Sequence, residues 1–194
     1  MNTVREPDLE PSLLHAGWSD QEYLDFDANQ LVEFTDGMIE VLPVPTLTHQ
    51  LIVQMLFSLL EAFVRPGSLG TVLVAPYKLR IREGAYREPD LIFVLAKHRD
   101  WLGEPFASGA DLVMEVVSPD RPERDLVRKR EEYAQAGIPE YWIVDPRNGL
   151  VTVLALEGSA YAVHGTFSAG ATATSRLLEG FAVAVSRIVA PRIP

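Results

Sequence analysis

Residues 87–94 read Arg-Glu-Pro-Asp-Leu-Ile-Phe-Val, and residues 111–118 read Asp-Leu-Val-Met-Glu-Val-Val-Ser. Both runs are short and rich in aliphatic residues, which predicts buried β-strands over 90–95 and 111–117. Side chains alternate along a strand, so Glu115 interrupts the apolar row on its own face. A buried carboxylate without a partner costs several kcal/mol or changes its pKa. Glu115 therefore needs a compensating group.

Two kinds of compensation fit this pattern. A Mg²⁺ ion bound by Asp90 and Glu115 would supply positive charge, because this cation takes one or two carboxylates together with waters and phosphate oxygens. A buried ion pair between Glu115 and Arg80, Arg82 or Lys129 would do the same without a metal. The two strand sequences leave both explanations open.

A charged segment follows the second strand and predicts a helix over 122–136. A proline lies near its first turn, acidic residues come early, and a glycine follows its end. Asp125, Lys129 and Tyr133 are four residues apart and form one stripe on this helix. We expect most of the helix to be exposed to solvent, and Lys129 to be functional if the stripe faces the sheet.

Further helices and strands surround these segments. Apolar residues recur every three or four positions over 48–64, which predicts a core helix. Asp36-Gly37 between two apolar runs predicts a β-hairpin. We also expect a short helix over 19–26 and strands over 31–34, 38–42, 71–75, 77–82, 140–144, 150–156 and 161–166. The predicted fold class is α/β (α+β), with a restriction-endonuclease-like core in which a mixed central β-sheet is flanked by helices and preceded by an N-terminal β-hairpin.

The composition favours one domain. A chain of 194 residues with 47% hydrophobic and 23% charged residues can bury one sizeable core. We expect an N-terminal arm over 1–17 and a single domain over 18–190. The sequence has no cysteine, which excludes disulfides and thiolate metal sites and fits a cytoplasmic location. We expect no apolar stretch to reach the ~18 residues of a membrane span, and therefore no membrane partner.

The charge of the chain argues against a dedicated phosphate-binding protein. The formal net charge is −10 and the pI is about 4.8, whereas nucleic-acid-binding domains usually carry a basic face. A local basic groove can coexist with an acidic total, and carboxylates that hold a metal themselves add negative charge. The net negative charge therefore argues against DNA binding unless the site has a local basic surface.

Four stretches of the chain together resemble one known family. They are Glu33 to Gly37, residues 88–94, residues 111–119 with the stripe of the following helix, and Ala136 to Pro146. They are similar to the Uma-type restriction endonucleases, bacterial proteins of the PD-(D/E)xK nuclease superfamily, over about residues 18–156. The resemblance implies a nuclease-like core in which Asp90 and Glu115 bind Mg²⁺, with Mn²⁺ as a substitute.

The resemblance also implies a lysine that positions or activates the attacking water. In the superfamily this lysine usually lies two residues after the glutamate, where this chain has Val117. Lys129 occupies the matching place on the following helix, from which its charge could reach the same point in space. We expect the catalytic residues to be Asp90, Glu115 and Lys129, with the carbonyl of Val116 completing the protein ligands of the metal.

Four residues are candidates for accessory roles: Glu33, His49, Asp125 and Tyr133. Glu33 lies in the predicted hairpin, and His49 lies at the start of the core helix, where it could contact phosphate or water. Both positions are also compatible with ordinary surface residues. The structure must decide which of the four reach the site.

The leading functional hypothesis is a Mg²⁺-dependent endodeoxyribonuclease that acts on DNA as a homodimer. The alternative is a nuclease-like domain that does not cut and serves as a binding or oligomerisation module, which the acidic pI favours. A hydrolase of another phosphoester also fits, because the site chemistry does not name the substrate.

Overall fold

The computed structural model describes residues 14–26 and 30–189. Its larger sheet has the strand order β12-β11-β10-β9-β7-β4. β9 and β10 are parallel, and the other neighbouring pairs are antiparallel, so the sheet is mixed as predicted. The strands are β4 (Gly70–Val74), β7 (Leu91–Leu95), β9 (Leu112–Val116), β10 (Glu140–Asp145), β11 (Leu150–Glu157) and β12 (Ala160–Phe167).

The predicted hairpin belongs to a second six-stranded sheet, with the order β1-β3-β2-β6-β5-β8. It is therefore more than the two-stranded ribbon that its sequence indicates, and the strand expected over 77–82 lies here and not in the central sheet. Its aromatic and aliphatic side chains form a small core of their own, which includes Phe34, Ile39 and Tyr86. The strands are β1 (Leu14–Ala16), β2 (Val32–Thr35), β3 (Met38–Val41), β5 (Lys78–Arg82), β6 (Ala85–Arg87) and β8 (Phe106–Ala107).

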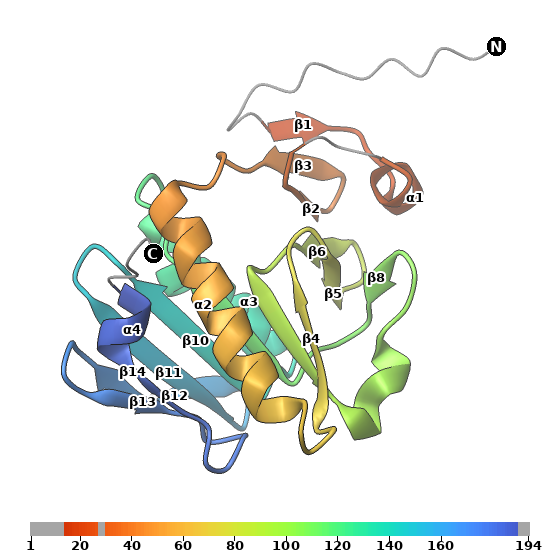
Figure 1. Cartoon of the computed structure of the whole chain (residues 1–194). Helices are drawn as coiled ribbons and strands as arrows, with labels where there is room; N and C mark the ends of the chain where they lie inside the picture. The colour runs from red at the N-terminus through yellow and green to blue at the C-terminus, as the bar shows by residue number, and fades with distance from the viewer. Residues whose placement is uncertain (1–13, 27–29, 190–194) are drawn as a thin grey trace.

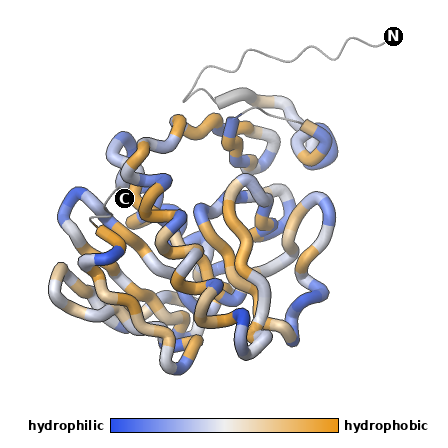
Figure 2. Tube along the Cα trace, in the orientation of Figure 1, coloured by the Kyte–Doolittle hydropathy of each residue, from blue (hydrophilic) through white to orange (hydrophobic). Residues whose placement is uncertain are grey.

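Helices cover both faces of the central sheet (Figure 1). α2 (Leu47–Val64) crosses one face, and α3 (Lys129–Gln135) packs on the other. On that second face, Tyr133 and Ala134 of α3 belong to an apolar cluster separate from the one that contains the buried residues of α2. Figure 2 shows apolar residues concentrated along α2 and the central strands. The remaining elements are α1 (Asp20–Leu24), the 3₁₀-helix η1 (Ala96–Trp101), the π-helix η2 (Arg124–Arg128), β13 (Thr172–Thr174), β14 (Ala182–Ala184) and α4 (Val185–Val189).

Local sequence signals explain where the first helices begin. Ser19 caps α1 in a reciprocal capping box with Glu22, and Thr46 caps α2 by accepting the backbone N–H of His49. Gly37 has a φ of +83°, as the turn after Asp36 requires. These turns and caps fix where the hairpin ends and α2 starts, which is next to the site described below.

α2 is long and apolar enough, by length and composition, to span a membrane. The expectation that no segment reaches that length is therefore wrong for this helix. In the structure one face of α2 packs on the central sheet, and Ile52, Leu56, Leu60 and Val64 are fully buried there. A helix that supplies this much of a core stabilises the fold through apolar burial.

Replacing Leu56 by alanine should lower the free energy of unfolding by about 2–5 kcal/mol, because the change leaves a cavity between α2 and the sheet. Thermal denaturation should show it as a melting temperature lower by roughly 2–4 °C per kcal/mol. Leu47→Ala is the matched control, since Leu47 lies on the same helix and is 64% exposed. Equal melting temperatures for the two variants would contradict the packing of α2 described here.

Candidate functional site

The register of the central sheet brings the two predicted carboxylates together. β7 runs antiparallel to β9, and Leu91 pairs with Met114. The next position therefore places Asp90 opposite Glu115 at one end of the sheet. Both side chains are buried and line one pocket, together with Val116. The sequence-based expectation that Asp90 and Glu115 are neighbours on adjacent strands is confirmed.

One carboxylate oxygen of Asp90 is held by the protein. Its Oδ2 accepts the backbone N–H of Val116 at 2.7 Å and lies 3.1 Å from Nε2 of His49. The N-terminal end of α2 therefore brings His49 directly to the site. Burial works against protonation of this imidazole, but the hydrogen bond and charge of Asp90 outweigh it and raise the pKa of His49.

Glu115 is held in the same way by the opposite helix. Its Oε1 accepts hydrogen bonds from Lys129 Nζ and from the Tyr133 hydroxyl, both at 2.6 Å. Burial, with the charges of Asp90 and Asp125, raises the pKa of Glu115 to about 7 against the opposing charge of Lys129. The pKa of Glu115 therefore stays above its ordinary value although Lys129 lies beside it.

Lys129 reaches the site from the helical segment that follows β9. Its Nζ lies 3.3 Å from Asp125 Oδ1 and 3.6 Å from Glu33 Oε1, as well as beside Glu115. Burial opposes its charge, but these three carboxylates outweigh it and raise the pKa of Lys129, so the side chain is an ammonium ion. Of the partners considered for Glu115, the structure selects Lys129.

The helical stripe faces the sheet, as the role of Lys129 requires. Asp125, Lys129 and Tyr133 are all buried, so the expectation of a mostly exposed helix holds only for the outer face. The segment begins as the π-helix η2 and continues as α3, and π-helical turns are frequent at functional sites. The charge pattern conceals this burial, because Lys129 has partners on the sheet and the hairpin besides Asp125 on its own segment.

Glu33 lies beneath this cluster. It is 2% exposed, pairs with Arg124, and has Arg87 Nε 3.3 Å away. Arg87 in turn binds both carboxylate oxygens of Glu132 on α3. Arg87 and Arg124 were not among the predicted site residues. The signal that could have indicated Arg87 is its position three residues before Asp90.

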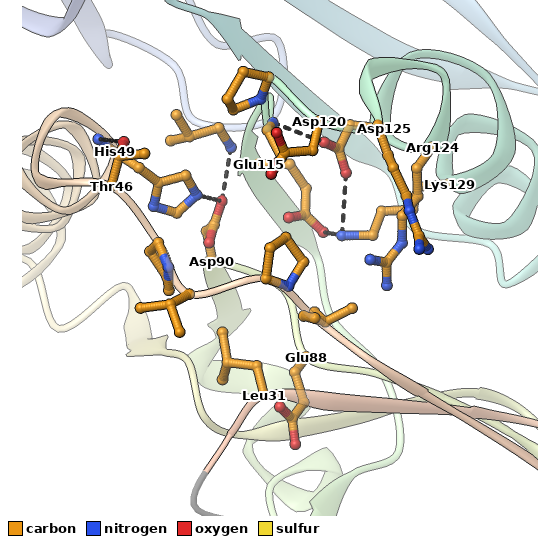
Figure 3. Close-up of a pocket in the computed structure, with 18 residues that line it drawn as sticks. Leu31, Thr46, His49, Glu88, Asp90, Glu115, Asp120, Arg124, Asp125 and Lys129 are labelled. Carbon is orange, nitrogen blue, oxygen red and sulfur yellow. Dashed lines mark hydrogen bonds and ion pairs between the residues drawn. The ribbon is translucent and has the colours of Figure 1, made fainter. Parts of the chain in front are cut away.

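All eight predicted site residues thus come together at one end of the central sheet. Figure 3 shows His49 and Asp90 on one side and Glu115, Asp125 and Lys129 on the other. The pocket between them has a volume of about 80 Å³, which suits an ion and its waters. Arg124 also lines it, as does Arg121, whose Nη1 lies 2.6 Å from Glu40. Basic side chains therefore line this pocket together with carboxylates, although the chain as a whole is acidic.

The donor set is compatible with a hard divalent cation. Among the described residues, no donor is bound to Asp90 Oδ1 or Glu115 Oε2, so each carboxylate has one fixed and one free oxygen. The same part of the chain contains no group of three or more His, Asp or Glu arranged to hold a metal. Mg²⁺ does not need such a group, because it keeps several waters and takes substrate phosphate oxygens. The two carboxylates therefore fit this ion.

Comparisons with known proteins support the same architecture. The Uma2 family, described as "Putative restriction endonuclease", matches residues 20–186. A crystal structure described as a "putative nuclease belonging to DUF820" from Anabaena variabilis ATCC 29413 superimposes with a TM-score of 0.72 and 15% sequence identity, over 87% of this chain and 96% of that one. No curated protein matches the chain.

Replacing Glu33 by glutamine should destabilise the protein by about 3–5 kcal/mol at neutral pH, because Arg124 and Arg87 would lose a buried counter-ion. Burial alone would raise the pKa of Glu33, but Arg124, Lys129 and Arg87 lower it to about 2. Its charged form therefore stabilises the fold above the ordinary pKa of 4.5, and this contribution is lost as the pH falls towards 2. Denaturant unfolding should show the difference from the wild type shrinking over that range.

Asp36→Asn is the matched control, because Asp36 forms an exposed ion pair with Arg82. Such pairs contribute about 0–1 kcal/mol. If the two variants lost the same stability at neutral pH, the buried cluster would not have the role assigned to it.

Proposed function

The chain belongs to the Uma2 family, and from this premise we propose that it is a Mg²⁺-dependent nuclease that hydrolyses phosphodiester bonds in DNA. The observation that carries the proposal is the pair of buried carboxylates, Asp90 and Glu115, each with one oxygen fixed by the protein and one free. Mn²⁺ should substitute for Mg²⁺, because the donors are hard oxygen atoms.

Asp90 and Glu115 would hold the metal, with the carbonyl of Val116 as a further ligand. When bound, Mg²⁺ supplies Lewis-acid polarisation of a phosphate oxygen and acidifies a water molecule. The protein contributes a preorganised donor set, since the Val116 N–H fixes Asp90 and the Tyr133 hydroxyl fixes Glu115. Side chains held in this way need no reorganisation during the reaction.

Lys129 contributes a fixed positive charge next to Glu115. An ammonium at this point stabilises negative charge that develops on the phosphate and orients the attacking water by hydrogen bonding. Asp125, 3.3 Å away, keeps the ammonium in place. His49 donates from Nε2 to Asp90 and so contributes to the position of this carboxylate. We therefore assign catalysis to Asp90, Glu115 and Lys129 and positioning to Asp125, Tyr133 and His49.

A second function is favoured by one specific observation. Lys129 already compensates Glu115 without a metal, as in a purely structural ion pair. A nuclease-like module that binds a partner but does not cut would have the same contact. Isothermal titration with Mg²⁺ and Mn²⁺ separates the two proposals. The nuclease should bind the metal ion and lose this binding when Asp90 is replaced, whereas the module needs no metal binding that depends on Asp90. Homodimerisation and a cytoplasmic location stay predictions.

Replacing Glu115 by glutamine should abolish Mg²⁺-dependent nicking of supercoiled plasmid DNA. Residues that hydrogen-bond to metal ligands typically contribute about 10–100-fold, so loss of a direct ligand should reduce the rate by at least about 100-fold. Glu157→Gln is the control, because Glu157 is exposed and the strand register places it at the opposite end of the sheet. Equal nicking by Glu115→Gln and the wild type would refute the proposed metal site.

Replacing Lys129 by methionine should separate catalysis from metal binding. The variant loses the ammonium but keeps both carboxylates, so calorimetry should show Mg²⁺ binding that is unchanged or tighter. The nicking rate should fall by about 10²–10³-fold, the usual effect of removing one preorganised electrostatic contact. A variant that cuts at the wild-type rate would show that Lys129 has only a structural role.

A further inference from the structure

A second, larger cavity adjoins the metal site. Its volume is about 410 Å³, and it lies between the N-terminal half of α2 and the end of β4, two elements that pack against each other. It shares Asp90, Leu31 and Pro45 with the smaller pocket. Any group bound in this cavity would therefore lie next to a carboxylate of the proposed metal site.

The two cavities differ in size and chemistry. The smaller one suits an ion and waters, whereas 410 Å³ lies within the range of about 300–1,000 Å³ typical of small-molecule sites. Among the residues that the structure describes, Asp90 is the one charged residue in the lining of the larger cavity. The other lining residues are apolar or uncharged: Leu31, Pro45, Gln50, Val53, Gln54, Phe57, Val74, Ala75 and Pro76. This lining disfavours a second phosphate and suits an uncharged, flat group.

Gln50 and Gln54 provide the polar contacts of this cavity. They are four residues apart on α2 and so lie on one face of the helix. Within residues 14–26 and 30–189, neither carboxamide hydrogen-bonds to another residue. A carboxamide both donates and accepts, which is the combination that the edge of a nucleobase requires. Phe57, one turn further along α2, adds an aromatic ring to the wall.

We propose that this cavity binds an unstacked nucleobase of the nucleotide next to the scissile phosphate. The proposal rests on the proposed nuclease function, since a phosphate at Asp90 would place its own base within reach of the cavity. Enzymes that bind an extruded base spend energy on unstacking it, and this cost is smallest where the base is mismatched or unpaired. The preferred substrate is therefore DNA with a mismatched or unpaired nucleotide.

An independent feature supports extrusion of a base. Val44 is 76% exposed and Leu47 is 64% exposed, and Val44 stands between Pro43 and Pro45 on the rim of the smaller pocket. Apolar side chains presented on a restrained backbone act in other proteins as wedges between base steps. A wedge beside the metal site and a base-sized cavity behind it are the two parts that extrusion requires.

The binding test uses deoxyadenosine and thymidine without phosphate or metal, with saturation-transfer NMR as the readout. Val74→Trp should fill the cavity, because Val74 lines its wall and is 41% exposed. It should weaken nucleoside binding about tenfold or more, the scale of a lost base-stacking contact. Val163→Trp is the matched control, since Val163 is 55% exposed on β12, and it should bind as the wild type does.

Gln54→Ala tests the same cavity without a bulky substitution. Gln54 is exposed, so the variant should keep the wild-type melting temperature and still lose nucleoside affinity. Gln135→Ala on α3 is the control, and it should keep both the melting temperature and the nucleoside affinity of the wild type. Wild-type affinity in both Val74→Trp and Gln54→Ala, or no nucleoside binding to the wild type, would overturn the proposal.

The cleavage test compares duplex oligonucleotides with and without one mismatched pair, in Mn²⁺. The wild type should cut the mismatched duplex faster, and Val74→Trp should lose this preference. Equal rates on both duplexes would overturn the base site and leave the nuclease function intact. The protein could also bind the nucleosides, lose this binding in Val74→Trp, and cut neither duplex. That result would support the base site and contradict the nuclease function.

Discussion

The ammonium of Lys129 connects three separate parts of the protein. It lies 2.6 Å from Glu115 on the central sheet, 3.3 Å from Asp125 on η2 and 3.6 Å from Glu33 on the hairpin. Buried charges remain ionised only when partners replace the water that they lose. The hairpin, sheet and helix are therefore arranged so that Glu33, Glu115 and Asp125 share this ammonium. The geometry of the site depends on that arrangement.

This constraint explains why the site is rigid before any ligand binds. Asp90 and Glu115 are each fixed through one oxygen by donors from different elements, the Val116 N–H for Asp90 and the Tyr133 hydroxyl for Glu115. The remaining oxygens face the pocket with their direction already determined. Arg87 and Arg124 secure the layer beneath through Glu33. A donor set supported in this way is suited to metal binding, because the supporting shell determines the positions of the ligands.

The acidic composition does not describe the surface at the site. The net charge of −10 is a sum over the whole chain, whereas Arg121, Arg124 and Lys129 gather around one pocket. All three pair with Glu33 or Glu40, so the local field comes from a network and not from free cations. Selectivity for a substrate should therefore depend on the shape of the site and on the metal proposed for it more than on long-range attraction.

Features that depend on neighbouring residues could be predicted from the amino-acid sequence. Asp36-Gly37 predicted the hairpin, the apolar periodicity predicted α2, and strand alternation with the position of Asp90 predicted the carboxylate pair. Which charges are buried together became known from the packing of the elements. Glu33 meets Arg124, 91 positions away, and the helix that appears exposed from its charges buries Lys129. Sequence periodicity reports which face of an element is apolar, but it does not report which element covers a buried charge, because that depends on how separate surfaces pack.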